Sequence, residues 1–312
     1  MGIMKENNHF ILIKSPYPWL ISAIWMILLF SQQILFAQTK ASISDIEGLK
    51  RNFTVFLPKN YSDTIDFPLV IYLHGYGWTV EQDMNYTRLY EVTDTTGYII
   101  VYPSGAPYWN SGISDNPDLP TSDVDDVGFI NALIDTLSEQ YSIDLYRVYA
   151  CGYSNGGFMS YKLACQLSNR IAAIASVGGV IPNSLMENCH PQRTIPILEI
   201  HGTDDWWVPM NGTDYWCSVD KTLSYWANYD NCTQIDRITL PDVNPKDSCT
   251  VEKIVYTNST NNCEVIYYKI IHGGHTWPGA GKPGYSHEGN VNDDFNANIE
   301  ILNFFKKYKL NR

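Results

Sequence analysis

Short, almost continuously hydrophobic stretches recur along the chain and alternate with longer amphipathic segments. Runs rich in Val, Ile, Leu and Tyr are typical of strands that are covered on both faces, as in a parallel sheet. We therefore predict strands over residues 52–57, 68–74, 98–103, 146–152, 171–177, 195–201 and 264–271.

The segments between these runs carry hydrophobic residues three and four positions apart, which is the spacing of one helix face. They predict helices over residues 123–141, 155–167, 214–229 and 293–309. Asp123, Asp125 and Asp126 begin the first of these, where carboxylates suit helix capping and the helix dipole, so we expect a structural role for them. The polar residues 233–262 are expected to be irregular. Strands alternating with helices predict an α/β fold with right-handed crossovers.

The first 37 residues have the pattern of a secretory signal. Lys5 and Lys14 precede an apolar run over residues 19–30, and the small residue Ala37 stands at a plausible cleavage site. Polar residues 31–33 break the run short of the roughly 20 residues that span a bilayer, which disfavours the alternative, a retained membrane anchor. We therefore predict a signal peptide over 1–37 and one domain over 38–312. The mature chain would be secreted or periplasmic, without stable membrane insertion.

Composition and charge narrow the class of protein. The chain is 45% hydrophobic and only 17% charged, which excludes an intrinsically disordered protein. The net charge of −12 argues against nucleic acid and anionic lipid as partners, because both require a positive surface. Aromatic residues make up 13% of the chain, so we expect many of them to line a surface or a cleft.

The chain contains seven Cys residues. Export would place them in an oxidising compartment, where most are expected to pair. Since seven is odd, at least one stays outside any disulfide within the chain. Cys151 closes an apolar run and is the expected buried thiol. The other six allow 15 connectivities, among which the spacing does not choose.

The sequence Gly152-Tyr153-Ser154-Asn155-Gly156 follows a predicted strand and precedes a predicted helix. In this setting, Gly-x-Ser-x-Gly predicts a nucleophile elbow, a sharp turn that holds a serine hydroxyl clear of competing contacts. The glycines are required because side chains at these positions would clash across the turn. Ser154 is therefore the candidate nucleophile.

An elbow serine needs a carboxylate and a histidine later in the chain, in that order. Asp204 and Asp205 follow one predicted strand, and His272 and His275 lie in the Gly-rich segment after the last strand. The carboxylate would hold the imidazole tautomer, and the imidazole would take the serine proton. Spacing alone leaves open which member of each pair has this role.

An oxyanion hole is expected beside the predicted strand 68–74. The Gly-rich turn after His74 would point a backbone N–H, that of Tyr76, at the substrate oxygen, and the N–H of Asn155 would be the second donor. We expect His74 itself to be structural and to hold this turn by hydrogen bonds of its ring.

Several segments together resemble the polyhydroxybutyrate depolymerase/feruloyl esterase family, which includes acetyl xylan esterases. They are residues 73–75, 102–105, 125–129, 152–157, 201–209 and 273–279; the last, Gly-Gly-His-Thr-Trp-Pro-Gly, is the most distinctive. The resemblance implies an α/β-hydrolase fold, with helices on both faces of a mostly parallel sheet. It further implies Asp205 as the acid and His275 as the base. It also suggests disulfides Cys165–Cys189 and Cys232–Cys263.

Tryptophans stand in or beside the loops that carry this chemistry. Because ligands bind outside the carboxyl ends of parallel strands, we expect an aromatic-walled cleft for a flat acyl group or a sugar. Trp216 and Trp226 lie in a predicted helix and are expected in the core. The motif loops contain no Arg or Lys that could bind a phosphate or carboxylate substrate. The expected substrate-binding tryptophans are Trp78, Trp109, Trp206, Trp277 and, beside them, Trp207.

These observations predict a secreted serine carboxylesterase that acts through a Ser154–Asp205–His275 triad and an acyl-enzyme. Expected substrates are hydroxycinnamoyl or acetyl esters of plant polysaccharide, or soluble hydroxyalkanoate oligoesters. The alternatives are an α/β-hydrolase peptidase, for which no peptide-terminus anchor is visible, and a catalytically inactive glycan-binding module. Metal-dependent hydrolysis through His272 and His275 is disfavoured because their Gly-rich spacing is not that of a helical zinc site. We expect neither a cofactor nor a metal.

Overall fold

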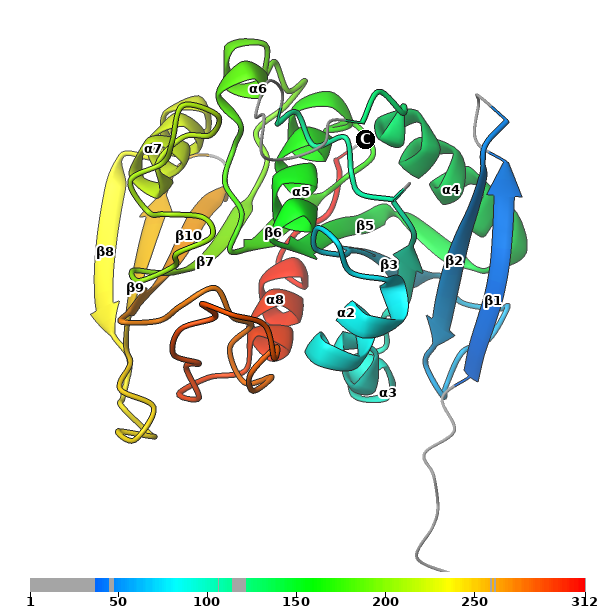
Figure 1. Ribbon diagram of the computed structural model, residues 1–312. Helices are drawn as coiled ribbons and strands as arrows, with labels where there is room; N and C mark the ends of the chain where they lie inside the picture. Colours follow the sequence, from blue (N-terminus) through cyan, green and yellow to red (C-terminus); the bar gives the residue numbers. More distant parts are fainter. Residues whose placement is uncertain are drawn as a thin grey trace, which may run out of the picture. The chain divides into compact units, whose positions relative to one another are not determined.

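The computed structural model describes residues 37–44, 48–105, 107–113, 122–258, 260 and 262–311. The predicted signal peptide therefore lies outside the described residues, except for Ala37. Among the described residues, strands form one 10-stranded sheet in the order β1-β2-β4-β3-β5-β6-β7-β10-β9-β8 (Figure 1). No helix in this part of the chain has the length and hydropathy needed to traverse a bilayer.

The centre of the sheet is parallel and its margins are antiparallel. Each of the predicted strands is present, with ends shifted by up to a few residues. Six of them, which follow one another across the sheet in the order β4-β3-β5-β6-β7-β10, pair in parallel. The strands of the parallel centre are β3 (Phe67–Leu73), β4 (Ile99–Pro103), β5 (Ile143–Tyr153), β6 (Ala173–Val177), β7 (Ile197–Gly202) and β10 (Glu264–Ile271). The antiparallel margins are β1 (Ala37–Ser44), β2 (Lys50–Leu57), β8 (Gln234–Thr239) and β9 (Thr250–Thr257).

The prediction that residues 233–262 are irregular is wrong, because they contain the antiparallel pair β8 and β9. All six side chains of β8 are exposed, and most of those of β9 are only half-buried. A strand with water on both faces needs no hydrophobic run, so the polar composition concealed it. Strand β1 was missed for a similar reason.

The four predicted helices are all present, and each is shorter than expected, α5 by a single residue. Asp125 accepts a hydrogen bond from the Gly128 N–H at 2.8 Å and so caps α4, which confirms the structural role expected of this residue. The helix predicted over 214–229 begins only at Val219, because the Ser218 side chain caps it there. The helices are α2 (Val80–Thr87), α3 (Thr93–Thr96), α4 (Asp126–Gln140), α5 (Asn155–Gln166), α6 (Asn183–Glu187), α7 (Val219–Tyr229), α8 (Ala297–Phe305) and the 3₁₀ helix η1 (Leu89–Val92).

Hydrophobic cores lie on both faces of the sheet. Along β3, Leu69 and Ile71 belong to the core that contains residues of α4, α5 and α7, whereas Val70 and Tyr72 belong to the core that contains residues of α2 and α8. Figure 1 shows α5 and α8 on opposite faces. Because side chains alternate across a strand, burial on both faces produces the continuous hydrophobic run seen in the sequence. The predicted arrangement of helices on both faces of a mostly parallel sheet is confirmed.

One of the two suggested disulfides is formed. Cys165 at the end of α5 is bonded to Cys189. Cys232 and Cys263 are not joined; the Cys263 thiol instead lies 3.3 Å from Asp230 Oδ2. Cys151 is buried outside any disulfide, as expected, and burial raises the pKa of its thiol.

Candidate active site

Ser154 occupies a sharp turn between β5 and α5, with φ 53° and ψ −116°. A positive φ is strained for any residue other than glycine, and such strain is typical of a nucleophile elbow. A Cβ atom on Gly156 would lie 1.9 Å from the Leu73 carbonyl oxygen, and one on Gly152 would lie 2.4 Å from the Gly156 carbonyl. The turn can therefore pack against β3 only because both positions are glycine.

Asp205 and His275 meet in the loops that follow β7 and β10. Their side chains are joined by a contact of 2.6 Å between Asp205 Oδ2 and His275 Nδ1, and each residue is only 4% exposed. The other carboxylate oxygen accepts hydrogen bonds from the N–H groups of Trp207 and Val208. Burial would raise the pKa of Asp205, but the His275 ring, the nearby His201 ring and the Val208 N–H outweigh it and lower the pKa. The carboxylate is therefore ionised at neutral pH.

The neighbouring pair, Asp204 and His272, is arranged differently. Asp204 Oδ2 lies 3.3 Å from His272 Nδ1, and both side chains are largely exposed to solvent. Residue spacing left the choice between the two aspartates and the two histidines open. The structure buries one Asp–His pair and leaves the other on the surface.

The His275 ring lies against the elbow that carries Ser154. It stacks on the Tyr153 ring at a centroid distance of 4.9 Å, and the Tyr153 hydroxyl donates to the His275 carbonyl at 2.6 Å. On the other side of the turn, the Ser154 N–H donates to the Val177 carbonyl, and a Cβ on the next residue, Gly178, would lie 2.9 Å from His275 Cε1. These contacts bring the His275 ring and its Asp205 partner close to the turn that carries Ser154.

The turn after β3 is held by two buried side chains. The His74 Nδ1–H donates to the Gly75 carbonyl at 2.9 Å, and its Nε2 accepts from the Gly105 N–H at 2.9 Å. Burial lowers the pKa of His74 to about 4, so the ring is neutral, as this pattern requires. The structural role predicted for His74 is confirmed. Asp83 of α2 accepts from the Gly75 N–H at 2.6 Å, and burial raises its pKa to about 7.

The two expected oxyanion donors, Tyr76 and Asn155, lie in different elements. Tyr76 follows the turn that Asp83 and His74 hold, and Asn155 is the first residue of α5, where a backbone N–H has no acceptor within the helix. The Asn155 side chain accepts from the Trp109 N–H at 2.8 Å and donates to the Ser111 hydroxyl at 3.0 Å. It thereby joins the elbow to the loop after β4.

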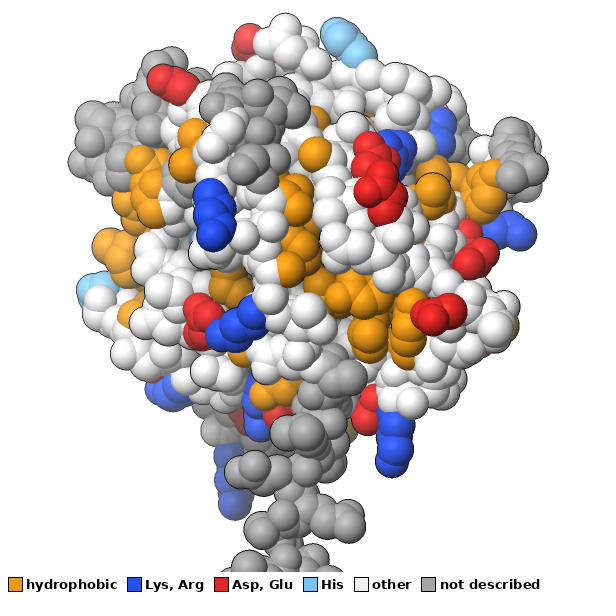
Figure 2. Space-filling model, turned by 90° about the vertical axis from the view of Figure 1, so that its right-hand side faces the viewer, with side chains coloured by type: hydrophobic (Ala, Val, Ile, Leu, Met, Phe, Trp, Pro, Cys, Tyr) orange, Lys and Arg blue, Asp and Glu red, His pale blue; other side chains and the backbone are white. Residues whose placement is uncertain are grey.

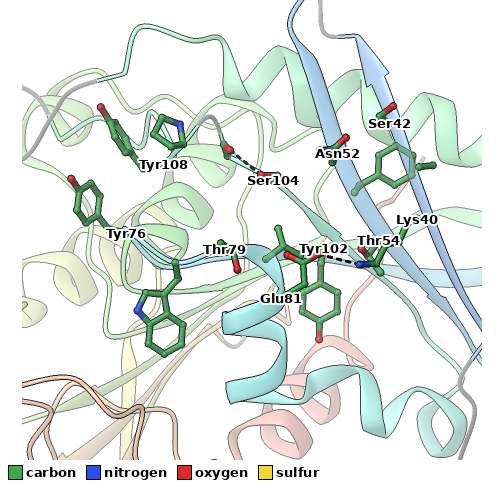
Figure 3. A pocket seen from close by; sticks show the side chains of 17 residues that line it. Lys40, Ser42, Asn52, Thr54, Tyr76, Thr79, Glu81, Tyr102, Ser104 and Tyr108 are labelled. Carbon is green, nitrogen blue, oxygen red and sulfur yellow. Dashed lines mark hydrogen bonds and ion pairs between the residues drawn. The ribbon is translucent and has the colours of Figure 1, made fainter.

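A groove of about 880 Å³ begins at Tyr76 and runs toward β1 and β2 (Figure 3). At one end, the rings of Tyr76 and Tyr108 lie 5.2 Å apart; at the other, Lys40 and Glu81 form an ion pair of 3.1 Å. Charged side chains of both signs are scattered over the face that carries β1 and β2 (Figure 2). The uncharged polar side chains that line the groove are those of Ser42, Asn52, Thr54, Thr79, Tyr102 and Ser104.

The tryptophans divide into surface and interior residues. Trp78 lines the groove, and Trp206, 59% exposed, stacks on the His287 ring at 4.6 Å.

Trp109 and Trp277 are 2% and 0% exposed, so the expectation that they form a cleft wall needs correction. The Trp109 indole donates to the His74 carbonyl and the Trp277 indole donates to Asn298, so both rings pack and support the loops. Trp216 and Trp226 are buried in the core, as expected, although Trp216 precedes α7.

Sequence reasoning missed three features of this site. Tyr108 and the buried Asp83 were missed because neither belongs to a recognisable sequence motif. The buried residues Glu199 and His201 lie on β7, where a charged residue within a hydrophobic run was a visible but unused signal. Among the described residues, no cluster of three or more His, Cys, Asp or Glu side chains is placed to hold a metal ion.

Comparison with known proteins places the chain among esterases. The phospholipase/carboxylesterase family model matches residues 63–223, about half of the chain. A bifunctional acetylxylan esterase/xylanase of Neocallimastix patriciarum is 34% identical over 163 residues, which are 51% of this chain and 22% of that protein. Feruloyl esterase D of Neurospora crassa is 27% identical over 173 residues, which are 52% of this chain and 56% of that protein. The chain spans between about a fifth and about three fifths of the length of these relatives.

Solved structures show the same fold. A CE1 ferulic acid esterase from the anaerobic fungus Anaeromyces mucronatus matches 89% of this chain and 94% of its own, with a TM-score of 0.52 and 19% identity. A dipeptidyl aminopeptidase IV homologue from Bacteroides ovatus matches 89% of this chain and 37% of its own, with a TM-score of 0.55 and 13% identity. Identities this low indicate the fold alone. The comparisons confirm the α/β-hydrolase fold and the resemblance to feruloyl esterases.

Proposed function

The chain belongs to the phospholipase/carboxylesterase family of α/β hydrolases, and from this premise we propose that it is a serine carboxylic-ester hydrolase with Ser154, Asp205 and His275 as its triad. The observation that carries the proposal is the buried Asp205–His275 pair, which lies against the elbow that bears Ser154. The strained backbone of Ser154 and the glycines packed around it support the same assignment.

In the proposed reaction, the Ser154 hydroxyl attacks the ester carbonyl carbon while His275 Nε2 takes its proton. Asp205 holds the Nδ1–H of the ring and stabilises the imidazolium. The backbone N–H groups of Tyr76 and Asn155 stabilise the oxyanion. Collapse of the tetrahedral intermediate expels the alcohol, which takes the proton from His275. Water, deprotonated by His275, then hydrolyses the acyl-enzyme and restores Ser154.

The proposed substrates are hydroxycinnamoyl or acetyl esters of plant polysaccharide, with soluble hydroxyalkanoate oligoesters as the second class. The groove beside Tyr76 supports a carbohydrate ester. Tyrosine rings offer flat apolar faces to a sugar, and uncharged hydroxyl and amide groups can bind its hydroxyls. The Lys40 ammonium is already paired with Glu81, so the groove has little attraction for an anionic substrate. The names of the relatives, feruloyl and acetylxylan esterases, agree with this choice.

We place the mature protein outside the cytoplasm, as a secreted or periplasmic enzyme. The signal-like pattern of residues 1–37 supports this location, and the Cys165–Cys189 disulfide is compatible with an oxidising compartment. The peptidase alternative has no specific support, because the likeness to a dipeptidyl aminopeptidase concerns the fold only.

The decisive experiment compares the native chain with Ser154→Ala on methyl ferulate, feruloylated and acetylated xylo-oligosaccharides, and soluble hydroxybutyrate oligomers. We expect kcat to fall by about 10⁶-fold in the variant on every ester that the native chain hydrolyses. Release of ferulate or acetate well above release of hydroxybutyrate would support the carbohydrate ester class. Hydrolysis that survives the substitution would refute the elbow mechanism.

A further inference from the structure

Two charged side chains lie fully buried behind the proposed catalytic acid. Glu199 and His201 are two positions apart on β7, so they point to the same face of the sheet. His201 Nδ1 lies 3.0 Å from Glu199 Oε1, and His201 Nε2 lies 3.5 Å from Asp205 Oδ2, the oxygen that also contacts His275. A continuous row of ionisable groups therefore runs from the interior to the site.

Both ring nitrogens of His201 face oxygen atoms, because Nε2 also lies 2.8 Å from the Val208 carbonyl. A neutral imidazole carries only one N–H, so one more proton must lie between His201 and Glu199. It resides either on the ring, as an imidazolium beside a carboxylate, or on the carboxyl group. Two neighbours favour the imidazolium: the ionised Asp205 attracts the positive ring, and the Tyr161 hydroxyl donates to Glu199 Oε2 at 2.8 Å.

The electrostatic surroundings agree with this assignment. Burial alone would lower the pKa of His201, but the hydrogen bond to Glu199 and the charge of Asp205 outweigh it and raise the pKa to about 9. Burial also raises the pKa of Glu199, so the pair as a whole retains its proton through neutral pH. Beyond Asp205 and His275, the titratable groups that face the row from α5, β5, β10 and the loop after β10 are neutral tyrosines whose pKa values are raised by burial. They are Tyr161, Tyr153, Tyr267 and Tyr285.

We propose that His201, held as an imidazolium by Glu199, is a positioning residue that fixes the Asp205 carboxylate and moderates its negative charge toward His275. This inference rests on the proposed function, since it concerns the same triad. A positive ring behind Asp205 weakens the field that stabilises a protonated His275.

The first test is the pH profile of kcat/KM for His201→Gln on a small aryl ester. Loss of the positive ring leaves the charge of Asp205 less compensated and strengthens the attraction of this carboxylate for a positive charge on its other partner, His275. We expect the acid limb of the profile to move up by about 0.5 to 1 pH unit. Glu199→Gln should move it in the same direction, because burial removes the proton from a His201 that has lost its counter-ion. The double variant should shift no further than either single variant, since both act on one proton.

The matched control is His272→Gln, which removes the exposed histidine that pairs with Asp204 in the same two loops. Its acid limb should coincide with that of the native chain. A His201→Gln variant with lowered kcat and an unmoved acid limb would overturn the proposal. Such a result would show that His201 acts through packing alone, because a loss of packing lowers kcat without shifting the pH profile. Failure of the proposed function is distinguishable, since it would appear as activity that persists in Ser154→Ala.

A second measurement needs no activity and no folded variant. In the native chain with ¹⁵N-labelled histidine, we expect one ring with both nitrogens protonated at pH 8. The signals of this ring can be assigned to His201 by correlations between its Nε2–H and the Val208 carbonyl, which lie in contact. A His201 ring that carries a single N–H at pH 7 to 8 would place the proton on Glu199 and refute the proposal.

Discussion

Asp204 and Asp205 are adjacent and chemically identical, yet their surroundings differ. Asp205 is buried and receives two backbone N–H groups and the His275 ring, whereas Asp204 lies at the surface beside His272. A carboxylate stabilises an imidazolium far better in a buried, preorganised site than in water. The local environment, and not the residue type, therefore separates the two aspartates.

The first prediction follows from this difference. Asp205→Asn should lower kcat by roughly 10⁴-fold, because an amide no longer favours the Nδ1–H tautomer and no longer stabilises the charged ring. Asp204→Asn, the matched control, should leave kcat close to that of the native chain. Steady-state kinetics on an aryl ester measures both. Equal losses in the two variants would contradict the assignment of the acid.

A second prediction concerns His74 and the stability of the turn after β3. Its pKa of about 4 in the folded chain lies below the ordinary value of 6.5, so between these limits the unfolded chain binds more protons. The stability contributed by neutral His74 is therefore complete above pH 6.5 and is lost as the pH falls toward 4, by about 1.4 kcal/mol per pH unit. In urea unfolding, the difference between the native chain and His74→Gln should shrink between pH 7 and 4.5. A difference independent of pH would show that His74 is not held neutral by burial.

At the residue scale, the motifs predicted which types of residue come together in the site. Packing determined which individual aspartate and which individual histidine do so. The elbow, the two candidate aspartates, the two candidate histidines and the role of His74 could all be stated from the sequence. Asp83, which supports the turn from α2, could not, since nothing in a linear pattern indicates that an acidic residue on a short helix will be buried. Trp109 and Trp277 were misplaced because nearness to a motif in sequence does not distinguish a ring that lines a cleft from one that packs beneath a loop.

At the scale of elements, the Cys165–Cys189 bond ties the end of α5 to the segment after α6. α5 begins at the elbow, so its position sets that of Ser154. The bond closes a loop with a sequence separation of 24 residues, which restricts the unfolded chain.

The third prediction is that Cys165→Ala/Cys189→Ala lowers the free energy of unfolding by about 3 kcal/mol. Addition of reductant should destabilise the native chain by a similar amount and leave the double variant unaffected, because the structure contains no other disulfide among its described residues. Denaturant unfolding with and without reductant measures this. A double variant that remains sensitive to reductant would indicate that a further pair forms in solution.

Elements of the sheet were predictable where the chain is buried and unpredictable where it is not. The central strands can be recognised in the sequence because their side chains pack into a hydrophobic core on each face of the sheet. The marginal strands β1 and β8 have mostly exposed side chains and each pairs with one neighbour, whereas β9 buries only Val251 and Ile254 among its eight residues. Such pairing depends on what lies beside a segment, which its own residues do not encode.

At the scale of the whole molecule, the groove extends from Tyr76 and Tyr108 to the β1–β2 margin of the sheet, and the proposed triad residues are not among those that line it. A fourth prediction follows for Tyr108, whose ring pairs with that of Tyr76 at the near end. Tyr108→Ala should lower kcat/KM on feruloylated xylo-oligosaccharides by roughly tenfold, since an aromatic contact with a ligand contributes on the order of 1 kcal/mol. Its activity on methyl ferulate should change little.

The control for this prediction is Ile238→Ala, an exposed residue of β8 at the opposite margin of the sheet. It should hydrolyse both esters like the native chain. An equal loss on the two esters in Tyr108→Ala would mean that the ring supports the catalytic turn and does not bind the sugar.

Strand β8 ends the sheet and pairs on one side only, with β9. Its outward backbone edge could template a strand from another molecule, and Ile235 and Ile238 would favour such stacking. Asp236 and Arg237 stand between them, and burying their charges at a dry junction would be costly. We therefore expect this short charged interval to oppose edge-to-edge association in concentrated solution, so crystallisation or immobilisation work should leave it unaltered.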